Sequence, residues 1–350
     1  MTTRSVDAAP AADVATSCRA RALYRDGSGE LHLNWPLERV GEAVQSGEGT
    51  LWLDLENTPD EASPFAERIL RDVFHFHPLA IEDALRETHI PKVDDWDDYI
   101  YLVFHASRID PDTDDLSLQE LDVFLGPNYL VTYHEEPLEF LTEARKAIEK
   151  DPRDRMKDGA DHLLFRFLDR SVDQSLAAIE ILDERIDDVQ DAVMSRIRPD
   201  ALQRIFRIKR SAIQLQKIFG PQRDVLGKLA RDPFKVVQKK HQVYFRDVYD
   251  HIVRIHDISE GLRDLIAGTL DTYLSVISNR TNEIMKTLTV VTVMFLPMSF
   301  ITGFFGMNFF GEALALDAGM PRWALFLGSL FVMALSPAVI LTLAKRRGWF

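Results

Sequence analysis

Four small polar residues recur near the C-terminal end of the chain, within a stretch that is otherwise mostly apolar. Asn282, Thr289, Thr292 and Ser299 are spaced by seven, three and seven residues. A helix turns once in about 3.6 residues, so these intervals place the four side chains near one helical face. Such a stripe can line a water path, or it can form hydrogen bonds with neighbouring helices. The spacing alone leaves both alternatives open.

Two long uncharged segments must position that stripe. One runs from Thr287 to Gly311 and the other from Trp323 to Ala344, with a short segment between them that carries Glu312, Asp317 and Arg322. Each exceeds the ~20 helical residues that cross a bilayer core. A pair of buried helices in a soluble protein is the alternative. The length of both runs at one end of the chain favours two membrane helices.

The positive charges that flank these segments predict their orientation. Arg280 and Lys286 precede the first segment, and three basic residues follow the second (Lys345, Arg346 and Arg347). Because basic residues near membrane ends favour the cytoplasmic side, both long flanks are expected inside and the short connection outside. The first 19 residues contain no continuous apolar run and are expected to form a disordered tail rather than a signal peptide.

Overall composition excludes some classes of function. The formal net charge is -14 with a pI near 5.2, which argues against binding to a phosphate backbone. Cys18 is the only cysteine, so an intramolecular disulfide and a CxxC metal site are excluded. The sequence contains no GxxxxGK[ST] loop for ATP. It also shows no arrangement of nucleophile, base and oxyanion donors, so we do not expect an enzyme.

An α/β domain is predicted for residues 20–135. RALYRDGSGELHL places a DGSG turn between two strand-like runs, TLWLDL alternates, and LDVFLGPNYLVTYH predicts a hairpin that turns at Pro127 and Asn128. The helical patterns ERILRDVF and HPLAIEDALR interleave with these strands. Strands mixed with helices indicate an α/β fold.

Helical periodicity dominates residues 136–286. One apolar stripe extends along the last helix of this region: Val248, Ile252, Ile255, Leu262, Ile266, Tyr273 and Ile277, interrupted by Ser259 and Thr269. No proline lies between Pro233 and Pro297, so one helix could run from Lys235 to Leu296. The stripe could pack against copies of itself or against the helices within 161–219. Self-association is the simpler prediction, with an intramolecular bundle as the alternative.

The end of the first apolar segment resembles the CorA family of Mg2+ channels. FFGMNF matches the GMN motif that ends the first of two membrane helices in that family. TYLSVISNRTNEIMK before it, the KRRGWF tail, and HPLAIEDALRETHIPKVDDWDDYIYLVF in the N-terminal half extend the resemblance over nearly the whole chain. A GMN tripeptide alone is weak, but these surroundings make the match specific.

The resemblance implies a funnel-shaped homopentamer in which a cytoplasmic α/β domain joins a long helical stalk that continues into two C-terminal transmembrane helices. The expected divisions are a tail (1–19), an α/β domain (20–135), a stalk region (136–286), a first membrane helix (287–311), an outer loop (312–322), a second membrane helix (323–344) and a basic cytoplasmic tail (345–350). The expected location is the inner or plasma membrane.

The resemblance also assigns functional residues. Gly306, Met307 and Asn308 would form the selectivity motif at the outer mouth, and the first membrane helix would line the pore with Asn282, Met285, Leu288, Thr292, Leu296, Ser299 and Gly303. Because Mg2+ loses its waters reluctantly, amide oxygens of Asn308 that accept hydrogen bonds from the hydrated ion suit this role. Apolar rings can gate a pore by dewetting.

Regulation by cytoplasmic Mg2+ is also implied, through carboxylates of the α/β domain and the stalk. The matching positions are Asp83 in IEDAL and Asp247 in YFRDVYD, with Glu82 as a neighbour. Bare carboxylates that face each other across subunits repel, whereas a bound cation bridges them and favours a closed state.

Other readings stay open. Zn2+, Co2+ or Ni2+ could be carried on the same scaffold, and the outer loop has Arg322 where the family commonly has an acidic residue after Met-Pro. Several histidines, among them His134 and His256, lack the spacing of a dedicated metal site. A membrane-anchored oligomer that senses without conducting is a further alternative. The polar stripe is a feature that a mere anchor would not need.

Overall fold

The computed structural model describes residues 18–57, 64–86, 90–110, 113, 115–151, 156–195, 199–307 and 322–348. The chain divides into two compact units, Met1–Thr269 and Leu270–Phe350. Each unit is described by itself.

The first unit is built on a seven-stranded sheet. Its strands are β1 (Cys18–Arg25), β2 (Leu31–His32), β3 (Thr50–Asn57), β4 (Lys92–Asp95), β5 (Ile100–Ile109), β6 (Leu116–Leu125) and β7 (Tyr129–His134). They lie in the order β2-β1-β3-β7-β6-β5-β4. Only β3 and β7 pair in parallel, with Leu53 opposite Val131. All other neighbours are antiparallel.

Both predicted turns are confirmed. The amide of Gly29 donates to the carbonyl of Asp26 between β1 and β2, and the amide of Gly126 donates to the carbonyl of Tyr129 between β6 and β7. TLWLDL forms the predicted strand, β3, but exposure does not alternate along it, because Leu51, Trp52, Leu53 and Leu55 are all fully buried. Helices cover both faces of the sheet, so the strand has no solvent-facing side.

One face of the sheet is covered by short helical segments. These are a 3-10 turn (Leu37–Arg39), α1 (Val40–Ser46), α2 (Pro64–Arg68), a π-helical turn (Ile69–Val73) and α3 (Pro78–Leu85). Phe76 stacks on Phe124 with ring centroids 4.2 Å apart. Leu70, Ile81 and Tyr133 belong to the same apolar core.

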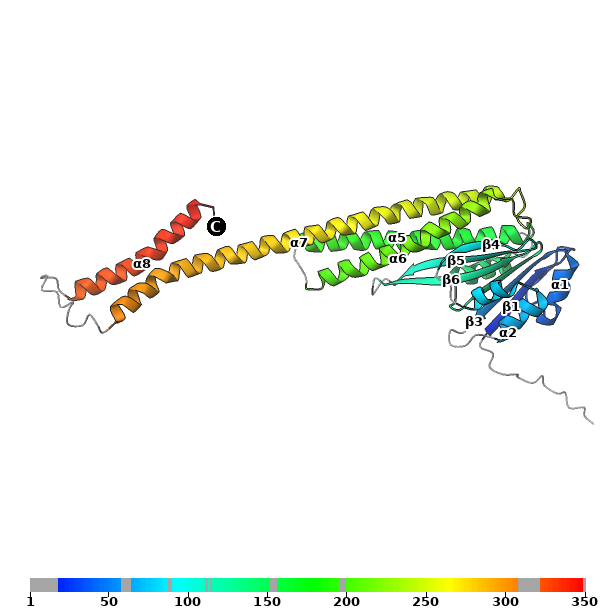
Figure 1. Ribbon diagram of the computed structural model, residues 1–350, viewed down its shortest axis with the longest axis horizontal. Helices are drawn as coiled ribbons and strands as arrows, with labels where there is room; N and C mark the ends of the chain where they lie inside the picture. The colour runs from blue at the N-terminus through cyan, green and yellow to red at the C-terminus, as the bar shows by residue number, and fades with distance from the viewer. Residues whose placement is uncertain are drawn as a thin grey trace, which may run out of the picture. The chain divides into compact units, whose positions relative to one another are not determined.

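Longer helices follow the sheet: α4 (Glu139–Lys150), α5 (Ala160–Ser195), α6 (Ala201–Arg231) and α7 (Gln242–Gly306). In the first unit α5, α6 and the first part of α7 lie side by side (Figure 1). Phe167 of α5 packs on Trp52 of β3, at 4.7 Å between ring centroids. Gln222 of α6 donates its side-chain amide to the carbonyl of His105 on β5. The helical layer is thereby anchored to the second face of the sheet.

The apolar stripe of α7 is buried within the chain. Val248, Ile252 and Ile255 are at most 1% exposed, and Ile266 lines a small apolar gap together with residues of α5 and α6. Gln190 of α5 donates to the hydroxyl of Thr269 at 2.9 Å. The intramolecular bundle, our alternative, therefore accounts for the stripe as far as Thr269, so this part of the stripe gives no evidence for self-association.

The helix α7 also differs from its predicted bounds. It begins at Gln242 rather than Lys235, and it continues through Pro297 to Gly306. Pro233 is followed by turns up to the helix start. Pro297 removes one backbone donor without ending the helix, a departure that membrane helices tolerate. The second unit contains the rest of α7 and α8 (Arg322–Arg346).

Candidate functional site

The two C-terminal helices are long and apolar enough to cross a bilayer. Their large apolar side chains are exposed: Leu288 is 57% exposed, Phe300 69% and Phe331 65%. Water would make such surface costly, at roughly 25 cal/mol per Å². Lipid or partner protein is the environment that suits it.

A narrow stripe on each of these helices is sheltered. On α7 it comprises Val290, Met294, Pro297, Met298 and Ile301, and on α8 it comprises Ser329, Met333, Ser336, Pro337, Ile340 and Ala344. Val290 and Ala344 are the most buried of them, at 4% and 7% exposure. Each stripe repeats at three and four residues, so each is one helical face. The two helices pack through these faces.

The seven residues predicted to line a pore are all exposed in the single chain (Asn282, Met285, Leu288, Thr292, Leu296, Ser299 and Gly303). At about 100° per residue they fall within one arc of about 120° on α7, and none belongs to the stripe that meets α8. Thr289, which we grouped with the polar stripe, falls within the same arc and also lines the groove beside α8. A second face of α7 is thus left for other partners or for water.

The hydroxyl of Thr292 has a defined orientation. It donates to the carbonyl of Leu288 at 2.9 Å. With its proton used by the helix, the oxygen has lone pairs left that can only accept. Water molecules bound to a cation present their hydrogens outward, so an acceptor is the group that such a hydrated ion needs. Thr292 therefore has the right polarity for a wall facing hydrated cations.

The GMN motif is described in part. Gly306 ends α7, and Met307 is 49% exposed with its amide directed at the carbonyl of Phe304. Asn308, the residue expected at the mouth, lies outside the described residues, as do Glu312 and Asp317 of the connection. The selectivity assignment stays a prediction.

Asp83, the first predicted regulatory acid, lies on α3 and has a partner that sequence reasoning missed. The ammonium of Lys92 on β4 lies 2.5 Å from the Asp83 carboxylate and 2.9 Å from Asp94. Burial would lower the pKa of Lys92, but its hydrogen bonds to Asp83 and Asp94 outweigh burial and raise it. A cation at Asp83 would have to compete with this ammonium.

Asp247, the second predicted regulatory acid, is exposed near the start of α7. Burial raises the pKa of Asp169 on α5, and the neighbouring acids Asp173 and Asp247 add to the increase. Asp247 therefore belongs to an acidic group that His251 only partly offsets. The structure places Asp83 and Asp247 on separate elements, each with its own neighbours.

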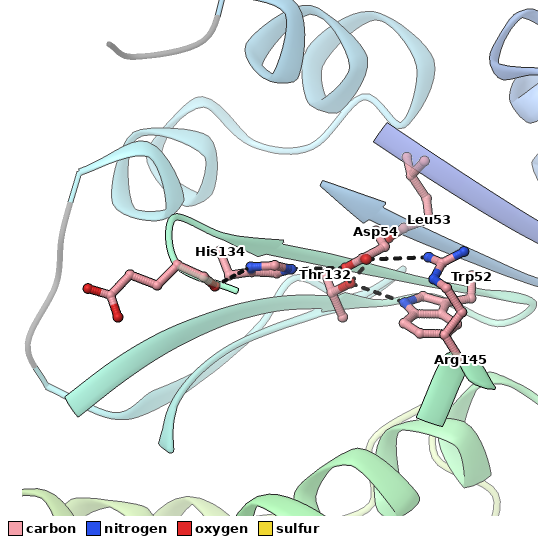
Figure 2. A network of polar contacts seen from close by, with 7 residues as sticks. Trp52, Leu53, Asp54, Thr132, His134 and Arg145 are labelled. Carbon is pink, nitrogen blue, oxygen red and sulfur yellow. Dashed lines mark hydrogen bonds and ion pairs between the residues drawn. The ribbon is translucent and has the colours of Figure 1, made fainter. Parts of the chain in front are cut away.

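A buried charged network that the sequence did not indicate links β3, β7 and α4 (Figure 2). The Asp54 carboxylate accepts from Thr132 at 2.7 Å and pairs with His134 at 3.2 Å and Arg145 at 3.3 Å. Arg145 also lies over the ring of Trp52, at 4.7 Å from its centroid. All these side chains are at most 9% exposed.

His134 is held between two acceptors in this network. Its Nδ1 lies 2.7 Å from the carbonyl of Glu136 and its Nε2 faces Asp54, so both ring nitrogens need protons to donate. Burial alone would lower the pKa of His134, but the hydrogen bond and charge of Asp54 raise it. Burial would likewise raise the pKa of Asp54, and His134 and Arg145 lower it. These roles are structural, as expected for a histidine without metal-site spacing.

An acidic cavity of about 300 Å³ adjoins the same strands. Glu120, Asp122, Glu135 and Glu136 line it, together with Gln119, Tyr133 and His134 among others. Asp122 is 3% exposed and accepts a hydrogen bond from Tyr101 at 2.5 Å. Burial and the Glu120 charge raise the pKa of Asp122 well above its ordinary value. This chemistry could attract cations, but its carboxylates are not among the described groups close enough to share one ion.

Two other clusters have ligand atoms close enough to share an ion. Asp26, Glu30 and His32 surround the first turn, and His256, Asp257 and Glu260 lie on α7. Asp26 is already used by the turn, since its carboxylate accepts from Ser28 and Glu30. Exposed clusters of this kind are common without a metal.

Known proteins are similar to this chain in sequence and in fold. The family model described as CorA-like Mg2+ transporter protein matches residues 47–346. The "Cobalt/magnesium transport protein CorA" of Thermotoga maritima is 35% identical over 238 residues, covering 68% of each chain. The "Putative metal ion transporter YfjQ" of Bacillus subtilis is 30% identical and covers 92% of this chain and 95% of the relative.

Among solved structures, the complete CorA magnesium transporter of Methanocaldococcus jannaschii matches with a TM-score of 0.77 at 23% identity, covering 94% of this chain and 99% of that one. Full-length CmaX matches with a TM-score of 0.70 at 22% identity, covering 93% and 96%. The predicted fold, an α/β domain with a long helix and two C-terminal apolar helices, is confirmed. The family consists of transporters, in agreement with our expectation that the chain is not an enzyme. The chain therefore belongs to the family of CorA-like Mg2+ transporters, and it is a membrane protein whose two C-terminal helices span the bilayer.

Proposed function

We propose that this protein is a homopentameric channel that admits Mg2+ to the cytoplasm down its electrochemical gradient. The observation that carries the proposal is the exposed face of α7, which presents Asn282, Thr292 and Ser299 away from α8. A transporter of this family needs a polar path, and this face supplies acceptor groups along a helix long enough to span the membrane.

In the proposed assembly, five such faces surround one aqueous axis, and α8 forms the outer ring. Met285, Leu288 and Leu296 then make apolar collars between the polar positions, where loss of water can close the path. Gly306, Met307 and Asn308 shape the outer mouth. The amide oxygen of Asn308 accepts hydrogen bonds from the waters of Mg2+, which keeps its hydration shell.

The membrane potential drives the ion. Arg280 and Lys286 precede the apolar part of α7, and Lys345, Arg346 and Arg347 lie at the end of α8, which favours a cytoplasmic location for both flanks. A divalent cation that enters an inside-negative cell gains about 4.6 kcal/mol per 100 mV, twice the value for a single charge. Flux in this direction requires no ATP.

Cytoplasmic Mg2+ closes the channel in this proposal. Asp83 of one subunit and Asp247 of the next bind the ion between them, and bound Mg2+ favours the closed arrangement. The acidic neighbours Asp169 and Asp173 strengthen the cation affinity around Asp247. Lys92 weakens the cation affinity at Asp83. Closure therefore needs a concentration of free Mg2+ that is high enough to displace the Lys92 ammonium.

Co2+ is the alternative cargo. The name of the Thermotoga maritima relative includes cobalt as well as magnesium, and an outer-shell site made of amide oxygens discriminates weakly among hydrated divalent ions. Zn2+ and Ni2+ would be further competitors on the same scaffold.

Flux in proteoliposomes tests the proposal. Asn308→Ala should abolish Mg2+ uptake while the oligomer still assembles, because the outer acceptor ring is lost. Asn34→Ala, the same change at an exposed position of the α/β domain, serves as the matched control and should keep the flux. Full uptake by Asn308→Ala would refute the role of the motif. Competition by Co2+, Ni2+ and Zn2+ in the same assay ranks the cargo.

A further inference from the structure

The sheltered stripes of α7 and α8 both end in a cation at the same end of the helix pair. On α8, Arg347 follows Ile340 and Ala344 by seven and three residues, which keeps it on the face that meets α7. On α7, Lys286 precedes Val290 by four residues and occupies the α8-facing side. Val290 and Ala344 line one groove, and Lys286 and Arg347 each lie about one turn beyond them along their own helices.

A groove lies directly beside this cationic end. It has a volume of about 350 Å³ and is lined by Thr289, Val290, Val293, Ile340, Leu343, Ala344 and Arg347. All but Thr289 and Arg347 are apolar, and the hydroxyl of Thr289 is turned to the carbonyl of Met285. The volume falls in the range of small-molecule pockets. The lining suits a hydrocarbon chain with an anionic group at one end.

The two cations have no anionic partner among the described residues of the second unit. Within the described ranges 270–307 and 322–348, neither Lys286 nor Arg347 forms an ion pair. Two uncompensated cations at the rim of an apolar groove between membrane helices form a site for an acidic headgroup. Glu283 precedes Lys286 by one turn and lines a separate opening, and no ion pair joins the two side chains.

We propose that the groove between α7 and α8 holds one anionic phospholipid, whose acyl chain contacts Val290, Val293 and Ile340 and whose phosphate is bound by Lys286 and Arg347. Under the proposed orientation this is a lipid of the cytoplasmic leaflet, so the inference rests in this respect on the proposed function. The bound lipid fastens α8 to the pore-lining helix at the level where the helix enters the membrane.

Native mass spectrometry of the purified full chain tests this site. The protein is exchanged into equal amounts of phosphatidylglycerol and phosphatidylcholine, and the lipids that stay bound are counted. The wild type should retain phosphatidylglycerol in preference. The double substitution Lys286→Gln and Arg347→Gln should lower that preference by about 10-fold to 30-fold, because each cation near an anionic headgroup contributes about a factor of five.

Matched variants separate this site from charge in general. Lys345→Gln with Arg346→Gln removes the same charge at positions off the stripe and should leave the preference within about twofold. Arg347→Lys keeps a cation and should retain lipid even if the double variant assembles poorly. Val293→Trp fills the groove and should reduce retention of both lipids. Inorganic phosphate should displace none, since it lacks the acyl chain.

Equal retention of both lipids by the wild type would overturn the proposal. So would the same loss of preference in the two double variants, which would indicate surface charge alone, or displacement by inorganic phosphate, which would indicate a simple anion site. The lipid count does not depend on ion flux. A chain that keeps its lipid but conducts no Mg2+ would therefore contradict the proposed function and leave this site intact.

Discussion

The α/β domain buries charged side chains, whereas the helical pair at the C-terminus exposes large apolar ones. In the domain, Asp54, His134 and Arg145 are buried and fully engaged with one another. In the helical pair, Leu288 and Phe331 are exposed, and hydroxyls such as that of Thr292 bond back to their own helix. The two regions of the chain therefore differ in which side chains they bury and which they expose.

The difference shows which solvent each region is built for. Within the domain the sheet is covered on both faces, so each buried charge must find a partner inside the chain. The helical pair satisfies its backbone internally and presents hydrocarbon outward, as a bilayer requires. The exposed polar face of α7 is the exception, and it is the feature from which we propose conduction.

Breaking the buried network should produce the largest effect on stability. Asp54→Ala leaves Arg145 as a buried charge without its acid and removes the acceptor of His134, which should lower the free energy of unfolding by about 3–5 kcal/mol. Denaturant unfolding in detergent measures this loss. Thr292→Ala, which removes a hydroxyl that bonds only to its own helix, should change stability by less than about 0.5 kcal/mol. Equal losses of stability in Asp54→Ala and Thr292→Ala would contradict this difference between the two regions.

The pH dependence of the same network should be the next largest effect. The pKa of His134 is raised on folding, so its contribution is complete below its unfolded pKa of about 6.5 and is lost as pH rises through the folded value. The pKa of Asp54 is lowered, so its contribution is complete above about pH 4 and is lost as pH falls further. Both contributions are complete between about pH 4 and 6.5.

Substituting His134 should isolate the alkaline side of that profile. His134→Gln keeps a polar side chain but cannot titrate, so stability should fall less steeply from about pH 6.5 upward than in the wild type. Melting temperature measured across that range gives the slope. His75→Gln, a change of an exposed histidine outside this network, serves as the matched control. A wild-type slope in His134→Gln would mean that another group titrates.

The smallest expected effect concerns the regulatory acids. Lys92→Met frees the Asp83 carboxylate from its ammonium, so internal Mg2+ should inhibit uptake at a two- to fivefold lower concentration, the size of a partly exposed ion pair. Asp247→Lys should act in the opposite direction and loosen inhibition. Inhibition curves of proteoliposome uptake measure both shifts. If neither variant moved the midpoint, the regulatory proposal would fail.

Much of the fold could be read from the sequence, because local chemistry decides it. Local sequence was enough to predict the DGSG turn and the hairpin at Pro127 and Asn128. It was also enough to predict the two membrane helices, because each uncharged run is continuous in the chain. TLWLDL predicted its strand correctly but not its burial on both faces, because that burial depends on helices far along the chain. The stripe beginning at Val248 predicted a buried face correctly but not its partner, because periodicity carries no information on what covers it.

The site was predictable in part for the same reason. The arc from Asn282 to Gly303 follows from helical spacing and a resemblance, and the structure adds that this arc lies off the face that meets α8. The network around Asp54 joins residues about 80 to 90 positions apart, and no local pattern signals such contacts. Lys92 could have been suspected from its alternation with Asp94 on a strand, but its pairing with Asp83 required the fold.

Cysteine accessibility in reconstituted protein tests the central claim most directly. Thr292→Cys and Ser299→Cys should react with a charged, membrane-impermeant thiol reagent and lose Mg2+ flux, whereas Val290→Cys, on the face against α8, should react at least about tenfold more slowly. Cys18 is buried and should add little background. Equal reactivity at all three positions, or protection of Thr292→Cys and Ser299→Cys alone, would contradict an aqueous path along this face of α7.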